Sequence, residues 1–385
     1  MADVLIARGT GNVPAGLQKP DVASAVAELE PESAPLTVLT NRLNKRPSHN
    51  VKFSWWEEEL EPRFAEVEGA ITNVATTGAV VAGQGTRLAA DNLVRNTRTG
   101  EIIRIVTMTG DTITTMVRGV GAGGTGIAMN DADELLIYSI QKEEGADYRA
   151  PRSINPVEKV NYCQIFEHPY EVTGSMKAVQ TWTNPSDWQR KAKIAGIEHA
   201  KDHELAAWLG KPETAAGTSH PRRATGWFFH YVTTNAVDTG GATTEAEFFT
   251  GLGQMFRFGR KTKWGFGARI PVDVLNSFPR GHLQVQQGET TFGLRVMRYI
   301  SPHGDLNLVT QWLFGDGSFY NKYIAVVDME NCGKRYLSAN GESRDTKTVT
   351  DIIKTGDRDK ETLITECGYE FKLDKTHGFF SNITS

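Results

Sequence analysis

Two histidines, His199 and His203, lie four residues apart in the longest stretch of the chain that can form a helix. Residues at this spacing share one face of a helix, so both imidazoles could bind the same metal ion. Zinc hydrolases with this spacing carry a glutamate directly after the first histidine, where it acts as the general base. Here Ala200 follows the first histidine, Glu198 precedes it, and spacing identifies no third ligand. We interpret the pair as solvated or interfacial, and keep a metal-dependent hydrolase as an alternative.

A glycine-rich segment, residues 121–126, satisfies the letters of the dinucleotide-binding pattern G-x-G-x-x-G. That chemistry requires the loop to open a helix whose N-terminus faces the pyrophosphate. Asn130, Asp131 and Asp133 follow within a few residues, and a strand pattern comes next. The segment is therefore interpreted as a β loop, and no cofactor is predicted.

Side chains of the types used in hydrolases also occur near the hairpin pattern of residues 301–305 and beyond it. Ser301, His303, Asp316 and Asp328 could be imagined as parts of a catalytic triad. The nucleophile elbow G-x-S-x-G does not occur in the chain, and these residues lie in turn-like segments where their types are common. We therefore predict no catalytic residues.

One dense basic cluster interrupts the second half of the chain, with aromatic residues interleaved. It consists of Arg257, Arg260, Lys261 and Lys263, with Phe258 and Trp264 among them. Such a cluster can form a nucleic-acid patch. A solvated helix end, or charge pairing across a subunit boundary, is the favoured interpretation, because the net charge of the chain is −4.

The composition is that of a globular, loop-rich protein. The 385 residues include 23% charged and 39% hydrophobic residues and 38 glycines, and the length suits two or three domains. A net charge of −4 argues against a free nucleic-acid binder. No run of 18 apolar residues occurs, so we expect no membrane span, and the first residues lack the layout of a signal peptide. The three distant cysteines fit synthesis in a reducing compartment.

The element that must position the two histidines is a helix predicted over residues 187–209. Ser186 can cap its first turn, and Gln189 can reach back to the Ser186 amide in a capping box. Gly210 supplies a residue that ends a helix, and Pro212 prevents its continuation. At 1.5 Å per residue this helix is roughly 34 Å long, which is too long for a connector.

The same helix has apolar residues on two nearly opposite faces. One stripe consists of Ile194, Ile197, Leu205 and Trp208, and the other of Trp188, Ala192, Ala195, His199 and Ala206. A helix with two apolar sides packs against more than one body. The alternatives are a sandwiched core helix or a helix that also meets a neighbouring subunit.

The chain before this helix has two different characters. Residues 1–55 are poor in periodicity and are expected to form an arm. Trp55 and Trp56 are adjacent, and adjacent residues of a strand face opposite sides, so one should contact another element or chain. Residues 56–140 contain short strand patterns at 93–95, 102–108, 113–118 and 135–140, separated by glycine and aspartate turns. These strands predict a small β-barrel or sandwich.

After the long helix the pattern becomes mixed. Thr244 and Glu247 form a second capping box ahead of an amphipathic helix. Residues 264–270 read as a strand, residues 271–278 as a short helix, and residues 324–327 as a buried strand. Alternation returns over residues 363–380 and predicts closing strands. The order is arm, β insertion, long helix, mixed α/β unit and β tail.

This order, with three local stretches, resembles one family. The stretches are residues 144–147 leading to 161–166, residues 264–278, and residues 354–360 followed by Glu366 and His377–Gly378. Together they resemble the tailed-bacteriophage major capsid proteins of the Hong Kong 97 type, in a branch with a β-rich insertion before the spine helix. The resemblance covers most of residues 50–385.

The resemblance implies an α+β fold with an N-terminal arm, an extended loop, a peripheral domain with a long spine helix, and an axial domain. We expect the arm over residues 1–55, the β-rich insertion over 56–140 and the extended loop over 141–175. The peripheral domain should take 176–215, the axial domain 216–340, and the returning peripheral strands 341–385. Side chains expected at contacts between subunits are Trp55, Trp56, Trp188, His199, Trp208, Arg257, Arg260 and Lys261.

The implied function is a non-catalytic capsid subunit that assembles into pentamers and hexamers of an icosahedral shell around double-stranded DNA. The implied partners are further copies of the chain, a separate scaffolding protein, a portal protein and in some systems a decoration protein. The DNA would be a neighbour rather than a tightly bound ligand. The expected location is the virion, after assembly in the host bacterial cytoplasm. A phage tail or baseplate component is the alternative structural role.

Overall fold

The computed structural model describes residues 34–148, 153–179, 187–278, 283–284, 290–291, 294–315, 319–350 and 356–384. Most of the predicted arm, residues 1–33, and the predicted cap Ser186 lie outside this part of the chain. The chain divides into two compact units: Met1–Glu57 together with Glu158–Ser385, and Glu58–Val157.

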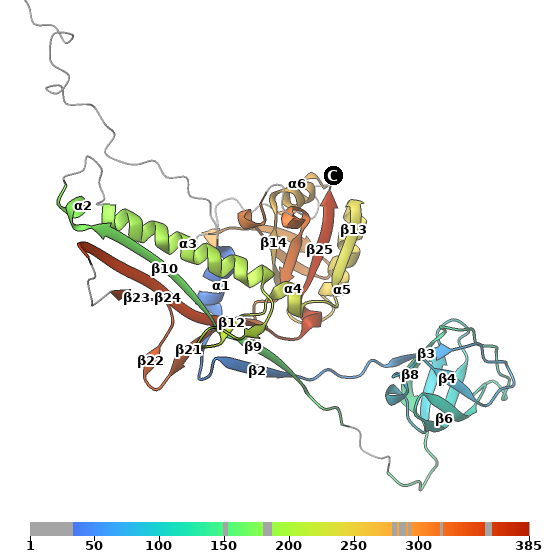
Figure 1. Ribbon diagram of the computed structural model, residues 1–385. Helices are drawn as coiled ribbons and strands as arrows, with labels where there is room; N and C mark the ends of the chain where they lie inside the picture. The colour runs from blue at the N-terminus through green and yellow to red at the C-terminus, as the bar shows by residue number, and fades with distance from the viewer. Residues whose placement is uncertain are drawn as a thin grey trace, which may run out of the picture. The chain divides into compact units, whose positions relative to one another are not determined.

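The long helix lies along a sheet of strands that come from distant parts of the sequence. The sheet has the order β1 (Lys45–Ser48), β21 (Cys332–Ala339), β24 (Arg358–Phe371) and β10 (Gln164–Thr173), with β22 (Glu342–Ser343) on β21 and β23 (Lys347–Thr350) on β24. Strands β10 and β24 pair antiparallel over ten residues of β10. Helix α3 (Asp187–Leu209) packs along β10 (Figure 1). Its bounds confirm the predicted helix.

The two predicted stripes of α3 differ in burial. The buried residues are Ala195, His199, His203, Glu204, Ala207 and Trp208. Ile194, Ile197 and Leu205 are only half-buried. The inner face of α3 therefore consists of small and polar residues together with Trp208, while the larger aliphatic side chains stay partly accessible.

A second sheet of seven strands contains the other large core of this unit. Its order is β13 (Ala236–Ala242), β25 (Gly378–Thr384), β20 (Ile324–Val327), β14 (Thr262–Gly267), β19 (Gly304–Thr310), β18 (Met297–Ser301) and β15 (Leu283–Gln284). Helices α5 (Glu245–Met255) and α6 (Arg269–Ser277) contribute Phe248, Leu252 and Leu275 to the core of this sheet. The predicted capping box of Thr244 and Glu247 is present at the start of α5. All four residues of β20 are buried, as predicted.

Short elements complete the first unit. Helix α1 (Pro35–Leu43) lies against α3, and α2 (Gly174–Ala178) follows β10. Strands β2 (Lys52–Glu57) and β9 (Val157–Tyr162) form a two-stranded ribbon. Two shorter ribbons are formed by β11 (Glu213–Ala215) paired with β12 (Arg222–Ala224), and by β16 (Thr290–Thr291) paired with β17 (Leu294–Arg295). The remaining helical turns are α4 (Phe228–Tyr231), η4 (Trp312–Phe314), η5 (Phe319–Lys322) and η6 (Asp374–Thr376).

The second unit is a closed barrel of six strands. Its order is β3 (Phe64–Glu68), β4 (Gly78–Val80), β7 (Thr112–Val117), β6 (Ile102–Thr109), β5 (Asn92–Asn96) and β8 (Glu134–Ile140), with the turn η3 (Gly85–Arg87) between β4 and β5. Alternate residues such as Val67, Val94, Ile103 and Ile105 fill the interior, which is the period expected of strands with one buried face.

The glycine-rich segment 121–126 connects two barrel strands and opens no helix. The buried carboxylate of Glu101 accepts hydrogen bonds from the backbone N–H groups of Gly119 (3.1 Å) and Ile127 (3.1 Å) on either side of it. Arg118 holds the same carboxylate by two bonds, Nε to Oε1 at 2.7 Å and Nη2 to Oε2 at 2.8 Å. The loop is anchored by an ion pair, as a structural β loop.

Candidate subunit-contact surfaces

The two histidines of α3 belong to a chain of hydrogen-bonding side chains beneath the helix. His199 Nδ1 lies 3.2 Å from His168 Nδ1 on β10, while His199 Nε2 lies 3.2 Å from His203 Nε2 and 2.8 Å from Thr365 Oγ1 on β24. His203 Nδ1 in turn lies 3.5 Å from Cys367 Sγ. Because His199 uses a different nitrogen toward each histidine, the three rings do not converge on one point.

These contacts give the histidines a structural role. No group of three or more histidine, cysteine or acidic side chains in the described ranges is arranged to hold a metal ion. Burial, together with neighbouring His168 and Lys334, lowers the pKa of His199 to about 4. The neutral pair therefore joins α3 to the sheet, and the structure gives no support to the hydrolase alternative.

One buried carboxylate on α3, which no pattern in the sequence indicates, ties three elements together. Glu204 Oε2 accepts from Thr37 N and Thr37 Oγ1, both at 2.7 Å, and Oε1 accepts from Leu36 N at 3.1 Å. Oε1 also accepts from Trp208 Nε1 (3.1 Å) and Gln311 Nε2 (2.5 Å). Thr37 and Leu36 belong to the first turn of α1, where unsatisfied N–H groups favour an anion. Glu204 thus caps α1 from another helix.

Three of the predicted contact residues are enclosed within their own subunit. Trp208 is fully buried, and its ring lies 5.2 Å from Phe266 and 5.5 Å from Phe314. Trp55 is buried against Tyr231, with ring centroids 5.3 Å apart. His199 is buried beneath α3. Packing within the subunit accounts for all three, which corrects the expectation that a neighbouring subunit is needed to cover them.

The adjacent tryptophan remains a contact candidate. Trp56 is 65% exposed, whereas Trp55 faces the interior, as the alternation of a strand requires. Trp188 is half-buried: its ring lies 4.9 Å from the Tyr170 ring, and Lys177 Nζ lies 4.4 Å from its centroid. A contact of Trp56 with another subunit stays a prediction.

The predicted basic cluster divides into exposed and buried members. Arg257, Arg260 and Lys261 are exposed, and Arg260 forms an ion pair with Glu330 of the same subunit. Lys263 is fully buried, and its Nζ donates to the carbonyl oxygens of Met255 (2.6 Å), Phe258 (2.9 Å) and Thr376 (2.5 Å).

Lys263 therefore has a role of its own within the cluster. Its ammonium satisfies carbonyls at the C-terminal end of α5, where a cation is favoured. Burial lowers its pKa to about 8. The cluster is therefore not one basic patch, and a contact of its exposed members with another subunit stays a prediction.

The residues considered for a catalytic triad do not form one in the described ranges. Ser301 Oγ donates to Gly304 O at 2.8 Å and closes the β18–β19 hairpin. Asp328 accepts from the backbone N–H groups of Arg260 (3.1 Å) and Glu330 (3.1 Å), which fixes a turn. Asp316 lies outside the described residues.

No described helix has both the length and the apolar character needed to cross a bilayer.

Two exposed aromatic side chains were not among the predicted contacts. Trp312 is 48% exposed and Phe319 is 70% exposed, in the neighbouring turns η4 and η5. Large apolar side chains exposed close together favour a protein contact. The signal in the sequence is the aromatic-rich run of residues 312–320, which carries no periodicity that distinguishes core from surface.

Substituting the buried and the exposed tryptophan is expected to separate folding from assembly. Trp208→Ala should lower the free energy of unfolding by about 3–5 kcal/mol, because it opens a cavity among aromatic rings. Trp56→Ala should change that free energy by less than about 0.5 kcal/mol, and should lower the yield of assembled particles. Urea unfolding of the unassembled subunit and sedimentation of assembled material measure the two effects. Wild-type particle yield from Trp56→Ala would remove Trp56 from the contact surface.

Comparison with known proteins relates this arrangement to a family. The sequence model of the family described as SU10 major capsid protein matches residues 9–384. A search of curated proteins gave no match.

Solved structures resemble the chain at low sequence identity. A chain from Microbacterium phage Oxtober96 has 8% identity and a TM-score of 0.50, covering 96% of this chain and 97% of that one, which shows a shared fold. A chain from the capsid of a native GTA particle has 8% identity and a TM-score of 0.46, covering 99% and 100%. A chain of the SrpI encapsulin complex from Synechococcus elongatus has 13% identity and a TM-score of 0.42, covering 60% and 76%.

Proposed function

The chain belongs to the SU10 major capsid protein family, and we propose that its parts take the roles of a Hong Kong 97-type shell subunit. It is a structural capsid protein of a phage, not an enzyme, and copies of it associate to form the shell. The match over residues 9–384 is the observation that carries this conclusion, because it spans both compact units of the chain.

In this proposal α3 is the spine of the peripheral domain, and the sheet of β1, β21, β24 and β10 lies beneath it. The length of α3 and its packing along β10 support this role. The seven-stranded sheet with α5 and α6 is the axial domain, which gathers at the centres of pentamers and hexamers. Under this proposal two of the expected domain boundaries would move. Cys332–Ala339 pairs in the peripheral sheet, and Gly378–Thr384 pairs in the axial sheet.

The ribbon of β2 and β9 is proposed to be the extended loop, with the barrel inserted into it. The barrel unit, Glu58–Val157, follows β2 directly, and the chain then continues through β9. A unit that begins and ends between the two strands of one ribbon can be inserted without changing the rest of the fold. This connectivity supports an insertion into the loop that reaches a neighbouring subunit.

We further propose that the shell is icosahedral and encloses double-stranded DNA in the virion, after assembly in the host bacterial cytoplasm. A separate scaffolding protein, a portal protein and in some assemblies a decoration protein would be its partners. The net charge of −4 would limit adhesion of packaged DNA to the shell wall.

Electron microscopy of the overexpressed chain, alone and with a candidate scaffolding protein, tests this function. We expect closed, uniform shells, produced in higher yield when the scaffolding protein is present. Tubes, rings or discs under both conditions would instead support the tail or baseplate alternative, and particles that form equally well alone would remove the need for a scaffolding partner.

A further inference from the structure

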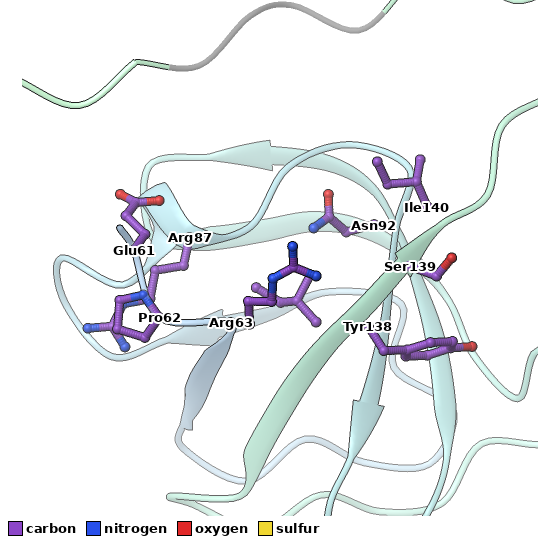
Figure 2. A pocket seen from close by; sticks show the side chains of 9 residues that line it. Glu61, Pro62, Arg63, Arg87, Asn92, Tyr138, Ser139 and Ile140 are labelled. Atoms are coloured by element: carbon purple, nitrogen blue, oxygen red, sulfur yellow. The ribbon is translucent and has the colours of Figure 1, made fainter. Parts of the chain in front are cut away.

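The barrel unit carries a pocket on its surface. The pocket has a volume of about 490 Å³ and lies where the segment before β3, the turn η3 and the end of β8 meet (Figure 2). All its lining residues belong to the barrel unit. Its volume is within the range of small-molecule sites, about 300–1,000 Å³. The polar groups of the pocket indicate what kind of molecule it would hold.

A buried amide lines the pocket without a hydrogen-bond partner for its oxygen. Asn92, the first residue of β5, is only 3% exposed, and its Oδ1 accepts no hydrogen bond from the residues that the structure describes. An amide oxygen has two lone pairs, and leaving a buried polar atom unsatisfied costs about 1–3 kcal/mol. A ligand that reaches Asn92 must therefore bring an N–H or O–H donor.

Two arginines also line the pocket. Figure 2 shows the guanidinium of Arg63 near the amide of Asn92, with Arg87 farther along the pocket. Arg87 is oriented by a bond from Nη1 to Phe64 O (3.2 Å), and its guanidinium carbon lies 5.5 Å from the centre of the Phe64 ring. The planar guanidinium groups present several N–H donors in a fixed geometry. The ligand must therefore carry acceptors as well as a donor.

The third requirement is an apolar face. The side chains of Tyr138 and Ile140 on β8 are 45% and 49% exposed and line the pocket on the side opposite Arg87 (Figure 2). A tyrosine offers a flat apolar body with a polar tip, which suits a ligand that is apolar on one face and polar at its edge.

We propose that this pocket binds a saccharide through one pyranose ring. Each hydroxyl of a sugar both donates and accepts, so adjacent hydroxyls can donate to Asn92 Oδ1 and accept from Arg63. The C–H face of the ring then packs on Tyr138. An extended peptide suits the site less well, because a closed barrel offers no free strand edge for main-chain pairing.

Saturation-transfer NMR on the full-length protein tests this proposal. The probes are glucose, N-acetylglucosamine and glucuronic acid, with N-acetylalanine methylamide as a peptide probe. We expect at least one sugar to receive saturation, with the pyranose C–H protons receiving most of it, and the peptide probe to receive none. Arg63→Ala and Asn92→Leu should each weaken sugar binding about fivefold or more, the effect of one lost hydrogen bond.

The control variant is Arg95→Ala, which removes an exposed arginine of β5 that does not line the pocket and should leave binding unchanged. Arg63 is also exposed, so Arg63→Ala keeps the test valid if Asn92→Leu disturbs folding of the barrel. The proposal is overturned if no sugar binds the folded protein, if only the peptide probe binds, or if sugar binding is the same in Arg63→Ala and Arg95→Ala.

Discussion

Replacing Glu204 with alanine is expected to lower the free energy of unfolding of the compact unit that contains α3 by more than about 3 kcal/mol. The substitution removes five hydrogen bonds and leaves the buried donors of Leu36, Trp208 and Gln311 without a partner. It also removes the anion from the N-terminus of α1, so α1 should separate from α3. Urea unfolding followed by tryptophan fluorescence measures the change. All eight tryptophans lie outside residues 58–157, so the signal excludes the barrel.

Two further substitutions make this prediction specific. Glu204→Gln keeps the shape of the side chain but turns an N–H₂ group toward donors, so it should also be strongly destabilising. Glu198→Ala removes an exposed glutamate of the same helix and should change stability by less than about 0.5 kcal/mol. If Glu204→Ala were as stable as Glu198→Ala, Glu204 could not be the group that holds α1.

Lowering the pH from 7 to 5 is expected to destabilise the same unit, and His377 is one of the buried histidines responsible. This side chain is fully buried, and its Nδ1 accepts from Asp328 N at 3.2 Å while its Nε2 lies 3.1 Å from Lys372 O. Only the neutral imidazole with a proton on Nε2 can make both bonds. Burial lowers the pKa of His377 to about 4, from an ordinary value of 6.5.

The direction of the effect follows from proton binding in the two states. Below pH 6.5 the unfolded chain binds a proton at His377 that the folded chain does not, so stability is complete above pH 6.5 and is lost between pH 6.5 and about 4. The loss from this one group is about 2 kcal/mol at pH 5. Burial also lowers the pKa values of His199 and His203, so they add to the loss in the same direction.

Urea unfolding at pH 7, 6 and 5 measures this dependence. His377→Gln should be less stable at pH 7 but should lose less stability between pH 7 and pH 5 than the wild type. His220→Gln replaces an exposed histidine and serves as the control. An unchanged pH dependence in His377→Gln would show that this histidine does not contribute to the loss.

Local signals in the sequence were sufficient for several of the regular elements. Helix α3 has the predicted bounds, and β20 coincides with the predicted run of residues 324–327. The capping box at Thr244 was also predicted, because its two residues stand three positions apart and interact locally. The opposite facing of Trp55 and Trp56 follows from the period of a strand alone.

Buried charges could not be predicted in the same way. Patterns of hydrophobicity assign charged residues to solvent, so Glu204 and Lys263 were not placed in the core. The partners of Glu204, Leu36 and Gln311, are separated from it by 168 and 107 residues. Only the folded chain brings such groups together. Trp208 was assigned to a subunit contact for a related reason, because a helix with two apolar faces does not reveal which face its own domain covers.

The most direct test of the account is a cryo-electron microscopy reconstruction of particles assembled from the chain. We predict a closed icosahedral shell in which the seven-stranded sheet lies at the centres of pentamers and hexamers, α3 runs through the peripheral domain, and Trp56 faces a neighbouring subunit. A shell with the seven-stranded sheet away from those centres, or an open tube in place of a shell, would contradict the proposed assignment of the domains.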